Sequence, residues 1–134
     1  MSVTRYPLVE DADGRTTVDL GENATEMTAL RMAPAETETL LRSGRWLVLG
    51  FAVWSGPDRE AIEVAISASK RLGSARVAVR PFDDHAEFAV WCPGAPQTTR
   101  SPIWLLLRDG EFVASRIGTA AVDEIVSFVE RTDE

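Results

Sequence analysis

Few residues of this 134-residue chain belong to the types that perform covalent or metal chemistry. It has one cysteine, Cys92, and one histidine, His85. A single cysteine cannot form an intramolecular disulfide, and one cysteine with one histidine cannot build a zinc site. Asp83 and Asp84 stand beside His85, but sequence neighbours point to different sides of a helix. We therefore expect no metal site and no bound cofactor.

A second candidate is the segment Ser55-Gly56-Pro57-Asp58. A nucleophilic Ser55 would need an adjacent base, and the sequence does not place His85 there. A structural role is simpler, because serine is a preferred helix N-cap and proline is tolerated in the first turn. An acidic residue three positions after the cap resembles a weakened capping box. We favour Ser55 as an N-cap and predict no catalytic residue.

Cys92 has two interpretations. Free cysteines usually behave as small buried apolar residues, and no basic neighbour in the sequence lowers the pKa of this thiol. We favour that interpretation. The alternative is an exposed, reactive thiol that forms mixed disulfides with a partner or with glutathione, since Pro93-Gly94 indicates a helix end near the surface.

Strands and helices that would position these residues alternate along the chain. Apolar runs predict strands at 29–32, 46–53, 76–82, 103–107 and 111–117. Helices are predicted from Pro34, with Leu40 and Leu41 inward and Gly44 as the stop, then after Ser55, within 83–92, and after a Thr119 cap. This order predicts an α/β fold with parallel strands first, then a hairpin at 108–110 and a closing helix.

The first 26 residues differ in composition from the rest. They hold six acidic and two basic residues and so carry −4 of the net charge of −7. Helical periodicity is weak there, and Asp13-Gly14 is a turn signal. We expect an acidic N-terminal extension over 1–26, partly disordered or folded as a loose hairpin, followed by one domain over 27–134.

The element order and several residues resemble thioredoxin. In that family an apolar strand ends in Trp-Cys-Gly-Pro-Cys, which opens the next helix, and here the same place reads Trp54-Ser55-Gly56-Pro57-Asp58. The family's cis-proline and two later glycines match Pro102, Gly110 and Gly118 in identity and in their spacing of eight residues. Over about residues 28–130 the resemblance implies a thioredoxin-like fold, a mixed central sheet flanked by helices, with a cis Ser101-Pro102 bond.

The departures from the family concern its chemistry. Ser55 and Asp58 replace both redox cysteines, and the family's buried aspartate, which assists proton transfer, falls on Leu49. Disulfide exchange needs a thiolate and a second thiol to resolve the mixed disulfide. The resemblance therefore implies a superfamily member that is not a dithiol-disulfide oxidoreductase.

In that family the loop before the cis-proline holds an extended peptide, beside the tryptophan loop and the second glycine. Carried over to this chain, the resemblance implies a protein-binding groove made of Trp54, Ser55, Gly56, Pro57, Asp58, Arg100, Ser101, Pro102 and Gly118. Arg100 stands where the family commonly has a small residue, so we expect it to narrow or recharge the groove. Trp46 and Trp104 are expected in the core, and Trp54 is expected to be partly exposed. For Trp91 we favour the core, the alternative being partial exposure as a protein-binding anchor together with Trp54.

Together these features predict a redox-inactive thioredoxin-fold protein that acts by binding another protein, as an adaptor, assembly factor or chaperone. One alternative is a monothiol redox protein that uses Cys92 for mixed disulfides or glutathione. Another is a structural role in which the acidic residues 1–26 dock onto a basic partner. The sequence specifies neither the partner nor the oligomeric state.

Composition and the distribution of apolar residues limit the classes of partner and the cellular location that we expect for this protein. The excess of 21 Asp and Glu over 14 Lys and Arg argues against a nucleic-acid partner. No apolar run approaches the roughly 18 residues of a membrane helix, and no apolar signal segment is evident, so we expect a cytoplasmic protein without membrane association. The strong preference for arginine over lysine suggests a bacterial source.

Overall fold

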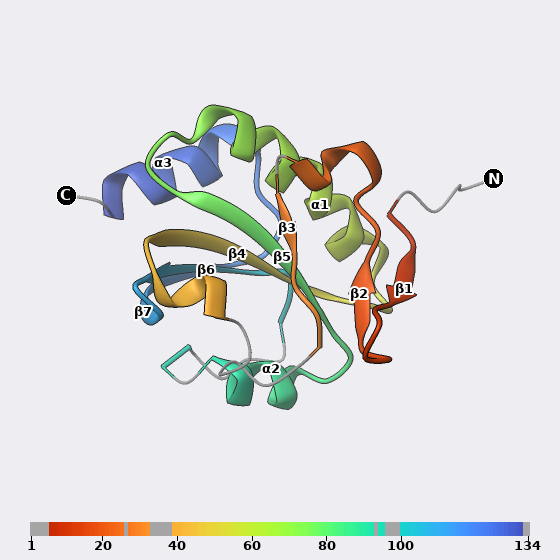
Figure 1. Cartoon of the computed structure of the whole chain (residues 1–134). Helices are drawn as coiled ribbons and strands as arrows, with labels where there is room; N and C mark the ends of the chain where they lie inside the picture. Colours follow the sequence, from red (N-terminus) through yellow and green to blue (C-terminus); the bar gives the residue numbers. More distant parts are fainter. Residues whose placement is uncertain (1–5, 26, 33–38, 93, 96–99, 133–134) are drawn as a thin grey trace.

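The computed structural model describes residues 6–25, 27–32, 39–92, 94–95 and 100–132 (Figure 1). The elements in chain order are β1 (Leu8–Glu10), β2 (Thr16–Val18), the 3-10 helix η1 (Gly21–Thr25), β3 (Thr28–Ala29), the 3-10 helix η3 (Thr39–Arg42), β4 (Arg45–Ala52), α1 (Gly56–Arg71), β5 (Arg76–Phe82), α2 (His85–Trp91), β6 (Ile103–Arg108), β7 (Glu111–Ile117) and α3 (Val122–Thr132). Five strands form a mixed sheet in the order β3-β5-β4-β6-β7, beside a two-stranded β1-β2 sheet.

The central sheet separates two hydrophobic layers. β3, β5 and β4 run parallel, whereas β6 is antiparallel to β4, and β7 is antiparallel to β6. In Figure 1, α1 and α3 cover one face of the sheet and α2 covers the other. Side chains alternate between the two layers along β4: Leu47, Leu49 and Phe51 join the α1–α3 layer, and Trp46, Val48 and Ala52 join the α2 layer. This burial on both faces explains the nearly continuous apolar run of β4.

The predicted strands of the second half agree closely with the structure. β5 and β7 have the predicted bounds, and β6 extends one residue beyond its predicted end. Asp109 and Gly110 adopt positive φ values of 51° and 86°, which form the predicted tight turn between β6 and β7. The Asp109 carboxylate also accepts the Gly44 N–H at 2.8 Å, which ties this turn to the residue before β4.

α1 follows the predicted amphipathic pattern, since Ile62 and Ala65 are fully buried and Lys70 and Arg71 occupy its last turn. α3 begins differently from the expectation. Ala121, rather than Thr119, immediately precedes the helix, and its N–H donates to the Glu124 carboxylate at 3.1 Å. None of the helices within the described ranges has the length and apolarity needed to cross a bilayer.

Residues 28–44 differ most from the prediction. The expected strand at 29–32 is shorter, as β3 covers only Thr28–Ala29. The expected helix from Pro34 falls mainly on residues 33–38, outside the described residues, and the described part is the 3-10 helix η3. Leu41 is buried as expected, but Leu40 is 50% exposed, so its predicted inward position was wrong. Successive side chains of a 3-10 helix lie 120° apart, so neighbouring residues do not share one buried face.

The N-terminal segment forms an ordered hairpin. β1 and β2 pair antiparallel around a turn in which Gly14 has a φ of 77°. Val18 and Leu20 are each 3% exposed and belong to the α1–α3 hydrophobic layer. The Arg59 guanidinium donates to the Tyr6 carbonyl at 2.7 Å, which connects the hairpin to α1. The expectation of a hairpin therefore agrees with the structure, but the hairpin is packed against the core rather than loose.

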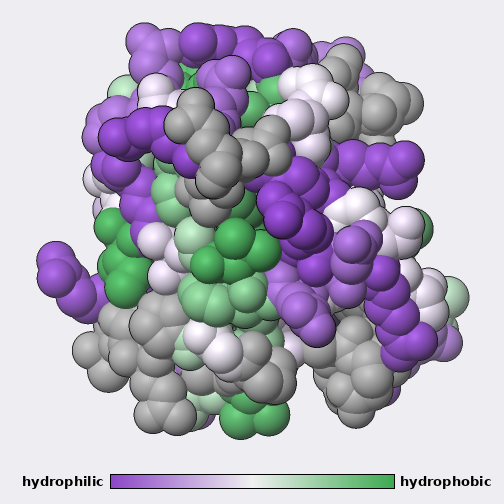
Figure 2. All heavy atoms as spheres, turned by 90° about the vertical axis from the view of Figure 1, so that its left-hand side faces the viewer, coloured by the Kyte–Doolittle hydropathy of each residue, from purple (hydrophilic) through white to green (hydrophobic). Residues whose placement is uncertain are grey.

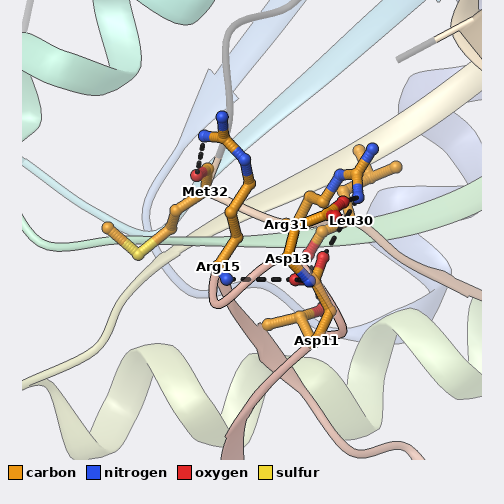
Figure 3. Close-up of polar contacts among 7 residues, drawn as sticks. Asp11, Asp13, Arg15, Leu30, Arg31 and Met32 are labelled. Atoms are coloured by element: carbon orange, nitrogen blue, oxygen red, sulfur yellow. Dashed lines mark hydrogen bonds and ion pairs between the residues drawn. The ribbon is translucent and has the colours of Figure 1, made fainter. Parts of the chain in front are cut away.

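Several acidic groups of this hairpin have partners within the chain (Figure 3). Arg31 lies between Asp11 and Asp13, with N–O distances of 3.1 and 2.9 Å. The Asp11 carboxylate also accepts the backbone N–H groups of Arg15 and Asp13. The Arg15 N–H is the largest cause that lowers the pKa of Asp11 below its ordinary value, and Arg31 adds to it. Part of the negative charge that we expected to dock onto a basic partner is thus paired with Arg31 within the chain.

Candidate functional site

The fold brings the candidate groove segments to one end of the sheet. The β4–β6 register pairs Gly50 with Ile103, so Pro102 and Ser101 lie beside the end of β4. β4 ends at Ala52, and Trp54 follows two residues later. The Gly118 N–H donates to the Pro102 carbonyl at 2.8 Å, which adds the β7–α3 connection to the same place. The segments expected to form the groove therefore meet in space, although they come from three parts of the sequence.

The backbone at this end has the expected special conformations. The Ser101-Pro102 peptide bond is cis, as the resemblance implied. Gly118 has a φ of 102°, a conformation that side-chain-bearing residues rarely adopt. The ring N–H of the buried Trp104 donates to the Gly118 carbonyl at 3.1 Å and holds this turn against the sheet.

Ser55 is the N-cap of α1, as predicted. It has extended backbone angles, and its hydroxyl oxygen accepts the Asp58 N–H at 3.3 Å while the hydroxyl donates to Asp58 Oδ1 at 3.1 Å. Asp58 does not complete a capping box with the Ser55 N–H. Its Oδ2 instead accepts the Ala52 N–H at 2.7 Å, and its side chain is buried. The hydrogen bonds of the Ser55 and Asp58 side chains together fix the loop between β4 and α1.

A catalytic role for Ser55 has no support in this geometry. Within the part of the chain that the structure describes, no interaction joins Ser55 to His85. The His85 ring instead contacts Trp54 and Phe82. The only group that accepts a hydrogen bond from the Ser55 hydroxyl among the described residues is Asp58, which the Ala52 N–H also engages.

Trp54 is the most prominent side chain at this end of the sheet. It is 58% exposed, whereas Trp46, Trp91 and Trp104 are buried, so the predicted sorting of the four tryptophans is confirmed. The Trp54 ring meets the rings of Phe82 and His85 edge to face, at centroid distances of 6.0 and 5.6 Å. These contacts hold the indole in place while leaving much of it open to solvent.

The remaining groove residues differ in accessibility. Gly56, Pro57 and Arg100 are exposed, Ser101 is half-buried, and Pro102 is buried. Arg100 lies two residues before the cis-proline, and its effect on the groove stays a prediction. Residues 96–99, which precede Arg100, lie outside the described residues.

Sequence reasoning missed a buried charge beneath α2. Arg80 is fully buried, and its guanidinium donates to both carboxylate oxygens of Glu87, at 3.0 and 2.5 Å. The guanidinium carbon also lies 4.8 Å from the Trp91 ring centroid and 5.6 Å from that of Phe88. An arginine within an otherwise apolar strand, followed by aromatic residues on the next helix, was the available signal.

Cys92 follows α2 and lies in the α2 hydrophobic layer. Its side chain is 7% exposed, which confirms the buried-cysteine interpretation. Desolvation by burial raises the pKa of the Cys92 thiol to about 11, so the thiol is protonated at neutral pH. A reactive thiol would need the opposite conditions, namely exposure and a lowered pKa.

The acidic residues near His85 have structural roles. The Asp84 carboxylate accepts the Ala86 N–H at 2.9 Å and caps α2. No group of three or more His, Cys, Asp or Glu side chains suitable for a metal ion occurs among the residues with described positions.

Solved structures with a similar fold include thioredoxins. A thioredoxin variant from Halobacterium salinarum NRC-1 superposes with a TM-score of 0.57 and 22% identity, over 72% of this chain and 81% of the other. Oxidized mitochondrial thioredoxin 3 from Saccharomyces cerevisiae gives 0.57 and 18%, over 72% and 87%. A chain from a study of thiol resolution in yeast mitochondrial 1-Cys peroxiredoxin by the glutathione and thioredoxin systems gives 0.59 and 18%, over 75% and 91%.

Similarity at the level of sequence is much weaker. No protein-family model matches this chain, and no curated protein matches it either. At these identities the structural similarity concerns the fold alone. The mixed five-stranded sheet, the helices on both of its faces and the structural matches establish that this chain has a thioredoxin-like fold.

Proposed function

We propose that this protein binds another protein through the surface around Trp54, without thiol chemistry, and acts as an adaptor, assembly factor or chaperone. The observation that carries the proposal is the 58% exposure of Trp54, a large aromatic side chain held in place by Phe82 and His85. Tryptophan is enriched among the residues that dominate binding energy at protein interfaces. A side chain that is already fixed loses less conformational entropy on binding.

The neighbouring backbone supports an extended peptide as the recognised element. The backbone N–H and C=O of Ser101 have no hydrogen-bond partner among the described residues. An extended segment of a partner can pair with such groups in the manner of an added strand. Trp54 and Arg100 would then contact side chains of that segment.

The absence of thiol chemistry rests on four positions. Ser55 and Asp58 occupy the places of the cysteines, and their side chains are hydrogen-bonded to each other. Leu49, at the position of the family's buried acid, is fully buried in the hydrophobic layer. Cys92 is buried, with a raised pKa. The proposal includes a bacterial, cytoplasmic setting, where a free cysteine is the ordinary state.

The test compares partner capture from the native host by wild type, Trp54→Ala and Cys92→Ser, with and without reductant. We expect wild type and Cys92→Ser to retain the same partner under reductant. Trp54→Ala should bind that partner at least about thirty-fold more weakly, because truncating such an anchor costs about 2 kcal/mol or more. Val90→Ala is the matched control, since Val90 is 79% exposed on α2 and lies outside the proposed groove.

Two outcomes would contradict the proposal. A partner that is lost on addition of reductant or in Cys92→Ser would identify the thiol as the working group and favour the monothiol alternative. A partner that Trp54→Ala and wild type bind equally well would place the interaction elsewhere. Denaturation midpoints of the variants should be measured alongside, so that a loss of binding is not confused with unfolding.

A further inference from the structure

A cavity of about 620 Å³ opens at the end of the sheet opposite the Trp54 loop. It lies where β4 and β5 begin and α1 ends, and its lining includes Ser43, Arg45, Trp46, Ser69, Ser74 and Arg76. Its volume falls within the range of about 300–1,000 Å³ that is usual for small-molecule sites. Figure 2 looks onto this end of the molecule, where hydrophilic residues surround hydrophobic ones near the centre of the view.

Arg76 is the group in this cavity with the most free hydrogen-bonding capacity. It is exposed, and its guanidinium carbon lies 5.7 Å from the centroid of the Trp46 ring. Trp46 is itself fixed, because it is 2% exposed and its ring N–H donates to the Ser43 carbonyl at 3.1 Å. Among the described residues Arg76 has no ion pair and no hydrogen bond. The Trp46 ring thus holds the Arg76 guanidinium in place, but no acidic group among the described residues neutralises the Arg76 charge.

Arg45 brings a second guanidinium to the cavity. It donates to the Ser74 hydroxyl and to the Val129 carbonyl, each at 3.2 Å. In the β4–β6 register Arg45 is directly opposite Arg108, and like charges in that arrangement destabilise a sheet. Glu111 is opposite Arg108 on β7 and offsets part of this repulsion.

This end of the molecule is basic in a protein whose net charge is −7. The ends of η3, α1 and β6 and the starts of β4 and β5 supply Arg42, Lys70, Arg71, Arg108, Arg45 and Arg76. Three acidic residues lie nearby: Asp109 accepts the Gly44 N–H, Asp123 pairs with Arg71, and Glu111 is opposite Arg108. Six basic side chains therefore gather at this end of a chain whose overall charge is negative.

We propose that this cavity binds a small phosphorylated molecule, with its phosphate against Arg76. A guanidinium presents a planar fork of donors that matches two phosphate oxygens, and a charge-assisted pair of this kind is stronger than a neutral hydrogen bond. Serine hydroxyls of the lining supply further donors. The site is independent of the Trp54 surface, and either assignment can fail without the other.

The test titrates the full chain with inorganic pyrophosphate at constant ionic strength, followed by calorimetry and by amide chemical shifts. We expect saturable binding, with the largest shifts at Gly73, Ser74 and Arg76. Arg76→Ala should weaken binding about tenfold, and Arg76→Lys should recover part of the loss, because lysine keeps the charge without the fork. Arg15→Ala is the control, as it removes an exposed arginine of the N-terminal hairpin.

Three results would overturn the proposal. One is binding that does not saturate, and another is equal weakening by Arg76→Ala and Arg15→Ala, which indicates general attraction of anions. The third is a set of chemical-shift changes that map to another part of the chain. Unchanged partner capture by Arg76→Ala is expected, and a loss of capture would show that the cavity and the Trp54 surface are not independent.

Discussion

Among the described residues, two charged side chains are buried, and the fold accommodates them differently. Asp58 at the start of α1 is 2% exposed, and Arg80 in β5 is 0% exposed. Asp58 is satisfied by groups within six residues of it, namely the Ala52 N–H and the Ser55 hydroxyl. Arg80 depends on Glu87 of the following helix and on the faces of two aromatic rings.

Asp58 is a local solution, in which neighbours in the sequence satisfy the buried charge. Arg80 is a tertiary solution, in which a different element satisfies it. The hydrogen bonds of Asp58 form when one loop closes, so they fix that loop and do little to position other elements. The contacts of Arg80 with Glu87, Phe88 and Trp91 exist only when α2 is docked on β5, so they help to select that docking. We expect changes at the Arg80 pair to cost more stability than changes at the α1 cap, because a buried charge without a partner is expensive.

The largest effect is expected for Glu87→Gln. It leaves the guanidinium of the fully buried Arg80 without its carboxylate, which should lower the free energy of unfolding by about 3 kcal/mol. We place the cost at the lower end of the usual range because Glu87 is 38% exposed. Urea denaturation of both proteins measures the difference.

The double variant Arg80→Met with Glu87→Gln is the decisive control. A methionine can pack against the Phe88 and Trp91 rings without a charge, and replacing a buried ion pair by apolar groups is often nearly neutral. Most of the lost stability should therefore return. A double variant no more stable than Glu87→Gln would show that Arg80 contributes through packing rather than through its charge.

An intermediate effect is expected from Cys92, which lies beside the same helix. Its folded-state pKa of about 11 exceeds the ordinary value of 9.0, so the folded state holds the proton more tightly than the unfolded state. This contribution is complete below pH 9 and is lost as the pH rises toward 11, by an amount on the order of 2 kcal/mol. Between these values wild type should lose more stability than Cys92→Ala. Parallel stability curves for the two proteins would contradict the burial of the thiol.

The smallest effect is expected for Ser55→Ala, on the local side of the comparison. Loss of an N-cap costs about 1 kcal/mol, because one N–H of the first helical turn loses its partner. Ser55→Gly should lower the free energy of unfolding by only about a few tenths of a kcal/mol, because glycine is itself tolerated at N-caps. Thermal or urea midpoints can resolve the two variants. If Ser55→Ala proved more damaging than Glu87→Gln, the distinction between local and tertiary solutions would be wrong.

The same distinction explains what could be predicted from the sequence. The bounds of β5 and β7 and the Ser55 cap depend on periodicity and on residues close together in the chain. The cis bond at Pro102 came from the family resemblance, which also located Trp54 and Gly118. The fold and the positions of these residues were accessible in this way because they follow local patterns or a known arrangement.

Other features depend on contacts between distant segments and were missed. The burial of Arg80 requires α2. The bond from the Ala52 N–H to Asp58 is local but was also missed, because it depends on the exact path of the loop rather than on residue spacing. The packing of Val18 and Leu20 requires a hairpin that the acidic composition of 1–26 obscured. The division of the chain at residue 26 stays a prediction.

The N-terminal hairpin also decides where the central sheet can grow. On the β3 side, the Met32 N–H donates to the Thr16 carbonyl at 2.8 Å and the Thr17 hydroxyl to the Leu30 carbonyl at 2.8 Å, so the chain's own hairpin covers that edge. On the other side, β7 ends the sheet. There Val113 stands at a β-bulge, and bulges discourage pairing with a further strand. Both edges of the described sheet are thereby protected against addition of a further strand, β3 by the hairpin and β7 by its bulge.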